Sequence, residues 1–447
     1  MTPATPPTSL PATNDLHLRR ELGAFGATMM GLGSILGTGV FVSIAIAAGI
    51  AGPAVVIAIA LAALVATCNA LNSAQLAASL PVSGGTYAYG YAYLRPWLGF
   101  AAGWMFLCAK SASAATAALG FAGYVLNALG HGEHATALRV GVAAGTVLLL
   151  TAIVLGGVRQ SNRVNVAIVS VTVLALATFV VAGALLAWSA GRENLTNLDH
   201  TAAATDFWPS LLQATALMFV AFTGYGRIAT LGEELRDPRR TIPRAIVVTL
   251  WSSATLYVAV ALVAVAAVGA GALGSMTTAE APLEQVARRF ALPGAGWIVS
   301  TGAMAAMLGV LLNLILGLSR VLLAMGRRGD MPVAVSRLNA DRTTPYVAVA
   351  VVGAIVLALT LIGNVRTTWS FSAFTVLIYY AITNLAALRL PDENRLYPKW
   401  IAWVGLVACL FLAFWVERNV WLAGLGLLAV GLIWHRVATR LPRGSAP

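Results

Sequence analysis

GLGSILGTG, residues 31–39, lies in the middle of an apolar segment near the start of the chain. A second apolar segment, far downstream, is interrupted in the same way by FTGYGR, residues 222–227. Each glycine in a helix interior costs about 1 kcal/mol relative to alanine, so these glycines predict breaks in both helices. In a bilayer, the freed backbone groups are tolerated only where protein or a water-filled cavity satisfies them. Two interrupted segments in the two halves of a membrane protein point to the binding site of a transporter.

The composition places both breaks in membrane-spanning helices. Of the 447 residues, 59% are hydrophobic and 10% are charged, whereas soluble proteins have about 25% charged residues. A spanning helix needs about 20 predominantly apolar residues. Twelve segments meet this need, at about 24–50, 53–79, 97–127, 138–156, 163–188, 208–232, 244–270, 292–325, 345–363, 366–389, 399–416 and 419–437. The sequence therefore predicts an all-α membrane protein with twelve transmembrane helices.

The net charge of +12 reports topology rather than a nucleic-acid partner. Most arginines gather at both chain ends and in every second loop, and few lie in the loops between. Basic residues accumulate on the cytoplasmic side of membrane proteins. We therefore expect a multi-pass protein of the plasma membrane, the inner membrane in a bacterium, with cytoplasmic tails at 1–20 and 438–447.

The order of the segments indicates two related halves. Residues 21–190 hold the first five spans and residues 207–390 hold the next five, and each half begins with a glycine-broken helix. An odd number of spans inverts the second half relative to the first, which predicts a five-plus-five inverted repeat. The last two spans, at 398–437, then form an appendage. Between the sixth and seventh spans, Pro238 and Pro243 are expected to end and restart helices.

Four motifs together resemble the amino acid–polyamine–organocation superfamily of permeases. The first is GSILGTGVF at 33–41, within the first span, and the second is PVSGGTY at 81–87, after the second span. The third is FTGYGRIAT at 222–230, followed by Glu233-Glu234, Asp237-Pro238 and Ile242-Pro243-Arg244. The fourth runs from Ser319-Arg320 to RGDMP at 328–332. The likeness covers roughly residues 20–435.

This resemblance implies a transporter that works by alternating access and binds its substrate at the unwound parts of helices 1 and 6. The N–H groups at Gly37–Gly39 would then bind a carboxylate, because a helix N-terminus attracts anions. The carbonyls of Ile35, Val220 and Thr223 would bind an ammonium group. The candidate substrate-binding residues are therefore Ile35, Gly37, Thr38, Gly39, Val220, Phe222, Thr223 and Gly224. Relatives carry an aromatic lid at the position of Val220, so here Phe219 or Phe222 replaces it or the site is more open.

The acidic residues narrow the class of substrate. All 16 Asp and Glu residues lie in tails, loops or helix ends, and none lies in the middle of a span. Many relatives have Asp or Glu two residues after the helix 6 glycine, where this chain has Gly226. A cationic amino acid or a polyamine would be expected to need such a carboxylate. The leading hypothesis is a carrier of neutral amino acids, by proton symport or exchange, and the alternative is a cationic amino acid or polyamine exchanger.

The coupling mechanism does not follow the usual pattern of the relatives. Where proton-coupled relatives have a lysine in helix 5, this chain has Thr172. Lys110 lies in the middle of helix 3 instead, and an ionisable residue within a membrane is a candidate functional group. Burial favours the neutral form of an amine, so Lys110 is the candidate proton carrier, unless its amine only bonds neighbouring helices. Arg227, beside the second break, either meets a substrate carboxylate or pairs with Glu233 or Glu234 on the cytoplasmic side, and we favour the second role, as a gating or structural residue.

Other classes of function fit the sequence less well. There is no nucleophile–base set and no phosphate-binding loop, so the chain is not expected to be an enzyme or to use a cofactor. Cys68, Cys108 and Cys409 lie in apolar spans without metal-ligand spacing, and no metal site is expected. A transport-inactive amino acid sensor is a further alternative, but it would be expected to carry a large output domain. The expected partners are a small amino acid and the lipid bilayer.

Overall fold

The structure is a computed structural model that describes residues 23–81, 84–130, 136–157, 162–190, 194–195, 206–229, 235, 237–276, 281–339 and 344–440. Nine helical segments in this part of the chain are long and apolar enough to cross a membrane. The first, Ala24–Ser79, has 56 residues and is long enough to cross twice. The shorter apolar helices Tyr346–Thr360 and Lys399–Ala413 complete the twelve expected spans.

The helices follow the predicted order, and the bounds of both halves are as follows. The first half contains α1 (Ala24–Ile35), the π-helical turn η1 (Gly39–Ser43), α2 (Ile44–Ala51), α3 (Val55–Ser79), α5 (Pro96–Ala128), α6 (Thr136–Leu155) and α7 (Asn162–Ala190). The second half contains α9 (Phe207–Phe222), the 3₁₀ turn η5 (Thr223–Tyr225), α10 (Gly226–Ala229), α11 (Pro238–Val268), α14 (Ala295–Arg328), α15 (Tyr346–Thr360) and α16 (Val365–Leu388). The last two spans are α17 (Lys399–Ala413) and α18 (Arg418–Arg440).

The contacts between helices repeat in the two halves. α5 packs against α16, and its counterpart α14 packs against α7. In the same way, α1 packs against α11 and α7, whereas α9 packs against α3 and α16. This exchange of partners is the pattern of a five-plus-five inverted repeat, so the predicted fold class is confirmed. The domain bounds 21–190 and 207–390 stay predictions.

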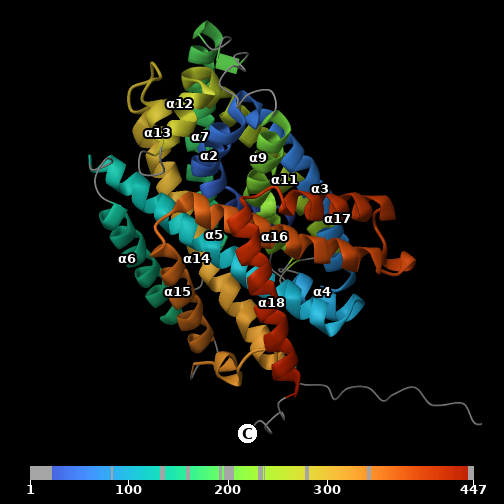
Figure 1. The fold of residues 1–447 in the computed structure, drawn as a ribbon. Coiled ribbons are helices and arrows are strands. Elements are labelled where there is room, and N and C mark those ends of the chain that lie inside the picture. The colour runs from blue at the N-terminus through green and yellow to red at the C-terminus, as the bar shows by residue number, and fades with distance from the viewer. Residues whose placement is uncertain are drawn as a thin grey trace, which may run out of the picture.

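Helix α5 lies at the centre of the bundle, between α14 and α16 (Figure 1). Its sequence is rich in alanine and glycine, which lets neighbouring helices approach closely where no hydrophobic effect drives association. At Gly103 an added Cβ would press on Met325 of α14, and at Gly120 it would press on Met307. The small residues of α5 therefore allow the two halves to pack face to face.

Short helices cover the two ends of the bundle. α12 (Ala270–Ser275) and α13 (Pro282–Ala287) lie at one end, and α4 (Thr86–Tyr93) lies toward the other, where α18 also ends (Figure 1). α4 is fixed there because the hydroxyl groups of Tyr87 and Tyr91 both donate to the buried carboxylate of Asp330, which follows α14.

The seventh span, α11, differs from the expectation that both Pro238 and Pro243 would end or restart a helix. α11 begins at Pro238 and continues through Pro243, so Pro243 does not restart a helix. Pro243 is the sixth residue of α11, past the unpaired N–H groups of the first turn, so the helix continues without one backbone hydrogen bond at this position. Pro238, in contrast, occupies the first position of the helix, where proline is favoured.

Candidate functional site

Both predicted breaks are present in the described backbone. α1 ends at Ile35, and Leu36 is extended, with φ −73° and ψ 98°. The helix then resumes, because the N–H of Phe41 donates to the carbonyl of Gly37 at 3.2 Å. In the second segment, α9 ends at Phe222 and the chain tightens into the 3₁₀ turn of η5 before α10. The first break is thus an extended residue, and the second is a change of helix type.

The two breaks lie against each other. A Cβ on Gly224 of η5 would overlap the backbone carbonyl of Ser34 in α1. A Cβ on Gly39 would overlap Ala221 at the end of α9. Glycine is therefore needed at both positions for the close approach of two backbones rather than for an unusual φ angle. This contact brings together sequence motifs that are nearly two hundred residues apart.

The resumed half of the first broken helix presents backbone N–H groups at its start. The first N–H groups of a helix have no partner within the helix, and the helix dipole places partial positive charge there. Here these groups belong to the segment Gly37–Gly39, which lies beside Val310 of α14 and Ala221 of α9. The side chain of Thr38 is buried, close to Gly120 of α5. The geometry suits a small anionic group such as a carboxylate.

The three carbonyls expected to bind an ammonium group each accept a hydrogen bond from a hydroxyl group. Tyr257 of α11 donates to the carbonyl of Ile35 at 2.7 Å, and Thr223 donates to the carbonyl of Val220 at 2.8 Å. Tyr380 of α16 donates to the carbonyl of Thr223 at 3.3 Å. The backbone N–H of Thr223 also donates to the carbonyl of Val220, so both lone pairs of that carbonyl oxygen are engaged.

Sequence reasoning missed Tyr257 and Tyr380, although both contact the breaks directly. Each is a tyrosine within an apolar span, far in sequence from the glycine motifs. Neither position has a spacing that relates it to Ile35 or Thr223, and only the packing of α11 and α16 brings the hydroxyl groups there. A buried tyrosine needs a hydrogen-bond partner, which is a general signal but not one that identifies the partner.

Lys110 lies at the second break. Its side chain is 8% exposed, and its Nζ donates to Oγ1 of Thr223 at 2.8 Å. Thr223 is the first residue of η5, and its hydroxyl group also bonds Val220. The lysine therefore reaches from the central helix α5 to the end of α9, where the helix dipole favours a cation. The candidate coupling residue and a candidate substrate-binding residue are in direct contact.

The other two candidate coupling or gating residues lie apart from this contact. Thr172 is buried in α7, and its hydroxyl group donates to the carbonyl of Ile168 in its own helix at 2.8 Å. Arg227 lies in α10, one turn after the break. Its expected partners, Glu233 and Glu234, lie outside the described residues. The proposed roles of Thr172 and Arg227 remain predictions.

Aromatic rings surround the second break. Phe222 packs against Tyr257, with ring centroids 5.1 Å apart, and Phe219 packs edge-on against Tyr380 at 5.7 Å. Both phenylalanines are fully buried. Both contact the tyrosines that bond the break carbonyls, and a lid role for either stays a prediction. The wall of the candidate site is thus aromatic and uncharged on this side.

Neutral hydroxyl groups join α5 to α16 beside Lys110. Ser113 and Ser372 lie 2.8 Å apart, and Thr116 and Thr368 lie 2.8 Å apart. Ser372 also donates to the carbonyl of Ala109 at 3.0 Å. These side chains pack the two helices together as an uncharged hydrogen-bonded seam. In the described residues, no group of three or more His, Cys, Asp or Glu side chains could hold a metal ion.

A chain of buried amides leads away from the second break. Asn384 donates to the carbonyl of Tyr380 at 2.9 Å, and Asn72 of α3 donates to Asn384 at 2.8 Å. Gln75 donates to Asn72 and accepts from the backbone N–H of Leu396 at 3.3 Å. Since Tyr380 bonds the break itself, this network connects the candidate site to the loop before α17.

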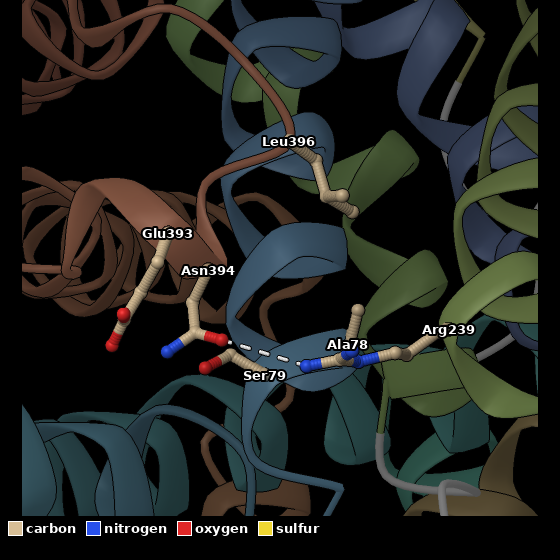
Figure 2. A pocket seen from close by; sticks show the side chains of 6 residues that line it. All are labelled: Ala78, Ser79, Arg239, Glu393, Asn394 and Leu396. Atoms are coloured by element: carbon tan, nitrogen blue, oxygen red, sulfur yellow. Dashed lines mark hydrogen bonds between the residues drawn. The ribbon is translucent and has the colours of Figure 1, made fainter.

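A small cavity lies at the far end of that network. Figure 2 shows Arg239, at the start of α11, pointing toward Asn394, with Nη2 and Oδ1 3.5 Å apart. The cavity has a volume of about 90 Å³ and is lined by Ala78, Ser79, Arg239, Glu393, Asn394 and Leu396. It is separate from the two breaks, since its lining residues come from helix ends and the loop before α17.

The chain is similar to known transport proteins over nearly its whole length. The sequence model described as amino acid permease matches residues 26–442. An uncharacterized transporter of Mycobacterium tuberculosis is 41% identical over 433 residues, which cover 96% of this chain and 94% of that relative. A branched-chain amino acid permease of Bacillus subtilis is 28% identical, over 96% of this chain and 95% of that relative. The human cationic amino acid transporter 4 is 28% identical, over 86% of this chain and 62% of that relative.

Proposed function

The chain belongs to the amino acid permease family, and we propose that it carries neutral amino acids across the bacterial plasma membrane by alternating access. The family and the named relatives are transporters rather than enzymes, which confirms both the resemblance read from the motifs and the non-enzymatic assignment. The choice of neutral substrates, the coupling and the orientation with both termini in the cytoplasm belong to the proposal.

The contact between the two breaks carries the proposal. It places the N–H groups of Gly37–Gly39 close to the end of α9, where the carbonyls of Val220 and Thr223 lie. A zwitterion offers a carboxylate to the first set and an ammonium group to the second. All α-amino acids share these two groups, so the backbone recognises the class and the surrounding side chains select the member.

The absence of an opposing carboxylate supports neutral substrates. In the described part of the chain, every carboxylate lies outside the spanning helices or at their ends, namely Asp206, Asp237, Glu284, Asp330, Asp392, Glu393 and Glu417. A cationic side chain brought to the breaks would therefore find carbonyls, hydroxyls and aromatic rings but no anion. Burying an unpaired charge is costly, whereas a zwitterion brings both charges with it.

The contact of Lys110 with Thr223 supports coupling through Lys110. A proton on Nζ strengthens the hydrogen bond to the second break, and loss of that proton weakens it. Substrate and proton would then both stabilise the same arrangement of α5 and α9, which is the requirement for symport. In the exchange alternative, Lys110 keeps its proton and only a second substrate molecule allows the return step.

A cationic amino acid exchanger is the second candidate, because one of the relatives is a cationic amino acid transporter. Uptake by purified protein in proteoliposomes separates the possibilities. We expect uptake of labelled leucine or alanine to be competed by neutral amino acids and not by arginine or putrescine. Competition by arginine at similar concentrations would favour the second candidate instead.

The same vesicles test the coupling. An inward pH gradient should stimulate uptake into vesicles without internal amino acid if the chain is a proton symporter. Uptake that ignores the gradient and requires internal substrate would refute symport and support exchange. Unchanged pH dependence in Lys110→Ala would exclude Lys110 as the proton carrier. A thermal-shift screen of the twenty amino acids on the purified protein identifies the ligand. A ligand at a concentration about 100 times its Kd stabilises the folded protein by about 2.7 kcal/mol.

A further inference from the structure

The charge of Lys110 is not balanced by any described neighbour. Its Nζ donates to the hydroxyl group of Thr223, and the side chains that join α5 to α16 around it are serines and threonines. The hydroxyl groups of Tyr257 and Tyr380, which also lie at the breaks, donate to backbone carbonyls and carry no charge. No described carboxylate lies within a spanning helix that could approach it. Lys110 therefore leaves a net positive charge at the second break whenever it is protonated.

We propose that Lys110 is the specificity-determining residue that excludes cationic amino acids and polyamines from the site. The proposal rests on the proposed function, because it assumes that substrates bind at the contact between the breaks. Thr223 connects the two roles: its carbonyl is a candidate ligand of the substrate ammonium group, and its hydroxyl group accepts the hydrogen bond from Lys110. A cationic substrate group that approaches Thr223 must therefore come close to Nζ.

The filter acts on the net charge of the substrate and not on the ammonium group that all amino acids share. A neutral amino acid brings its own carboxylate, so its interaction with Lys110 combines attraction and repulsion. An arginine, a lysine or a diamine adds a positive charge that nothing in the described site balances. Two like charges about 6 Å apart, at an effective dielectric constant of about 20, lower the affinity about 100-fold.

Proton symport and charge exclusion are compatible in this arrangement. A symporter binds substrate while its proton carrier is protonated, so Lys110 is positive at the moment when the substrate is selected. Arginine in place of Lys110 would keep the charge but would not release a proton, because its guanidinium group stays protonated. Methionine in place of Lys110 would keep much of the length and remove the charge. These two variants therefore separate exclusion from coupling.

The experiment measures competition in counterflow, with labelled neutral substrate and no pH gradient. We compare wild type with Lys110→Met, Lys110→Arg and the control Lys399→Met. Lys399 is the only other lysine of the chain, and it lies exposed on the loop side of α17, paired with Asp392 at 2.9 Å. The measured quantity is the ratio of the arginine inhibition constant to that of the unlabelled neutral substrate.

In wild type and in Lys399→Met, we expect arginine and putrescine to inhibit about 100-fold less than the neutral substrate. In Lys110→Met this ratio should fall by roughly 100-fold, whereas Lys110→Arg should keep the wild-type ratio and lose stimulation by a pH gradient. An unchanged ratio in Lys110→Met would overturn the filter. Strong inhibition of wild type by arginine would overturn both the filter and the choice of neutral substrates.

The failure of the filter and the failure of the proposed function give different results. If wild type shows no counterflow of any neutral amino acid, the proposed function is wrong. If wild type exchanges neutral amino acids but Lys110→Met still excludes arginine, only the filter is wrong. Should Lys110→Met bind substrate without moving it, thermal shift of the purified variant decides. If arginine raises the unfolding temperature of Lys110→Met but not that of wild type, the filter is supported. If arginine leaves the unfolding temperature of Lys110→Met unchanged, the filter is refuted.

Discussion

Replacing Gly224 by alanine tests the contact between the two breaks. The new Cβ would overlap the carbonyl of Ser34 and lie 2.7 Å from Cγ1 of Ile35, whereas ordinary van der Waals contact begins at 3.4 Å. The obstacle is partly backbone, so a side-chain rotation cannot relieve it. α1 and η5 must move apart by more than half an ångström. Overpacking of this kind costs about 1–3 kcal/mol.

Two matched controls make the test of Gly224→Ala specific. At Gly226, two residues further on, a Cβ would meet only the hydroxyl oxygen of Tyr380 at 3.3 Å. At Gly145 of α6, a Cβ would meet nothing within 4 Å, and alanine gains up to about 1 kcal/mol in helix propensity. All three changes add one methyl group to a spanning helix. They differ in what that methyl group contacts.

Thermal unfolding in detergent and uptake in proteoliposomes measure the effect. We expect Gly224→Ala to lower the stability by about 1–3 kcal/mol. Because the proposed site lies at this contact, a loss of the same size in binding would reduce the affinity for substrate by about 5- to 150-fold. Gly226→Ala should have a smaller effect, and Gly145→Ala should leave uptake unchanged. If Gly224→Ala unfolds and transports like Gly145→Ala, the breaks do not meet as described.

Three further predictions concern Tyr257, which the sequence did not single out, and Asp330 and Tyr87, which lie in two of the quoted motifs. Tyr257→Phe removes the donor to the carbonyl of Ile35 and should cost about 1 kcal/mol in thermal unfolding while changing the apparent affinity for substrate; unchanged affinity would show that Ile35 does not take part in binding. Asp330→Ala leaves the hydroxyl groups of Tyr87 and Tyr91 without their acceptor and should destabilise the protein by about 1–3 kcal/mol, whereas uptake per folded molecule should be retained. Burial, reinforced by the hydrogen bond to Asp330, raises the pKa of the Tyr87 phenol. Its contribution to stability is therefore complete below about pH 10 and declines only above that pH, which a series of unfolding measurements between pH 7 and pH 11 checks.

The sequence predicted that Lys110 is a functional candidate but not that it bonds the second break. Its position within an apolar span marked Lys110 as a candidate, because charged residues are costly in a membrane. The hydrogen bond to Thr223 could not be predicted, since 113 residues separate the two and no motif links them. The same holds for Tyr380, whose role at the break depends entirely on how α16 packs against α9.

Helix boundaries were predictable where glycine and proline act on their own backbone. The break after Ile35 and the change of helix type after Phe222 lie at the quoted motifs. The expectation for Pro243 was wrong because α11 begins at Pro238 and continues through Pro243 with one backbone hydrogen bond fewer. Local chemistry allowed either interpretation, and the tertiary fold decided between them.

The sequence by itself determined the twelve apolar spans, the two interrupted helices, the family and the lack of acidic residues within the spans. These properties depend on each residue's own preference for lipid, helix or turn, so they can be read locally. Only the tertiary structure decided that Gly224 meets Ser34, that Tyr257 and Tyr380 bond the break carbonyls, and that Lys110 reaches Thr223. Such contacts join helices far apart in the chain. They arise from the packing of small residues between the two halves, which no local pattern encodes.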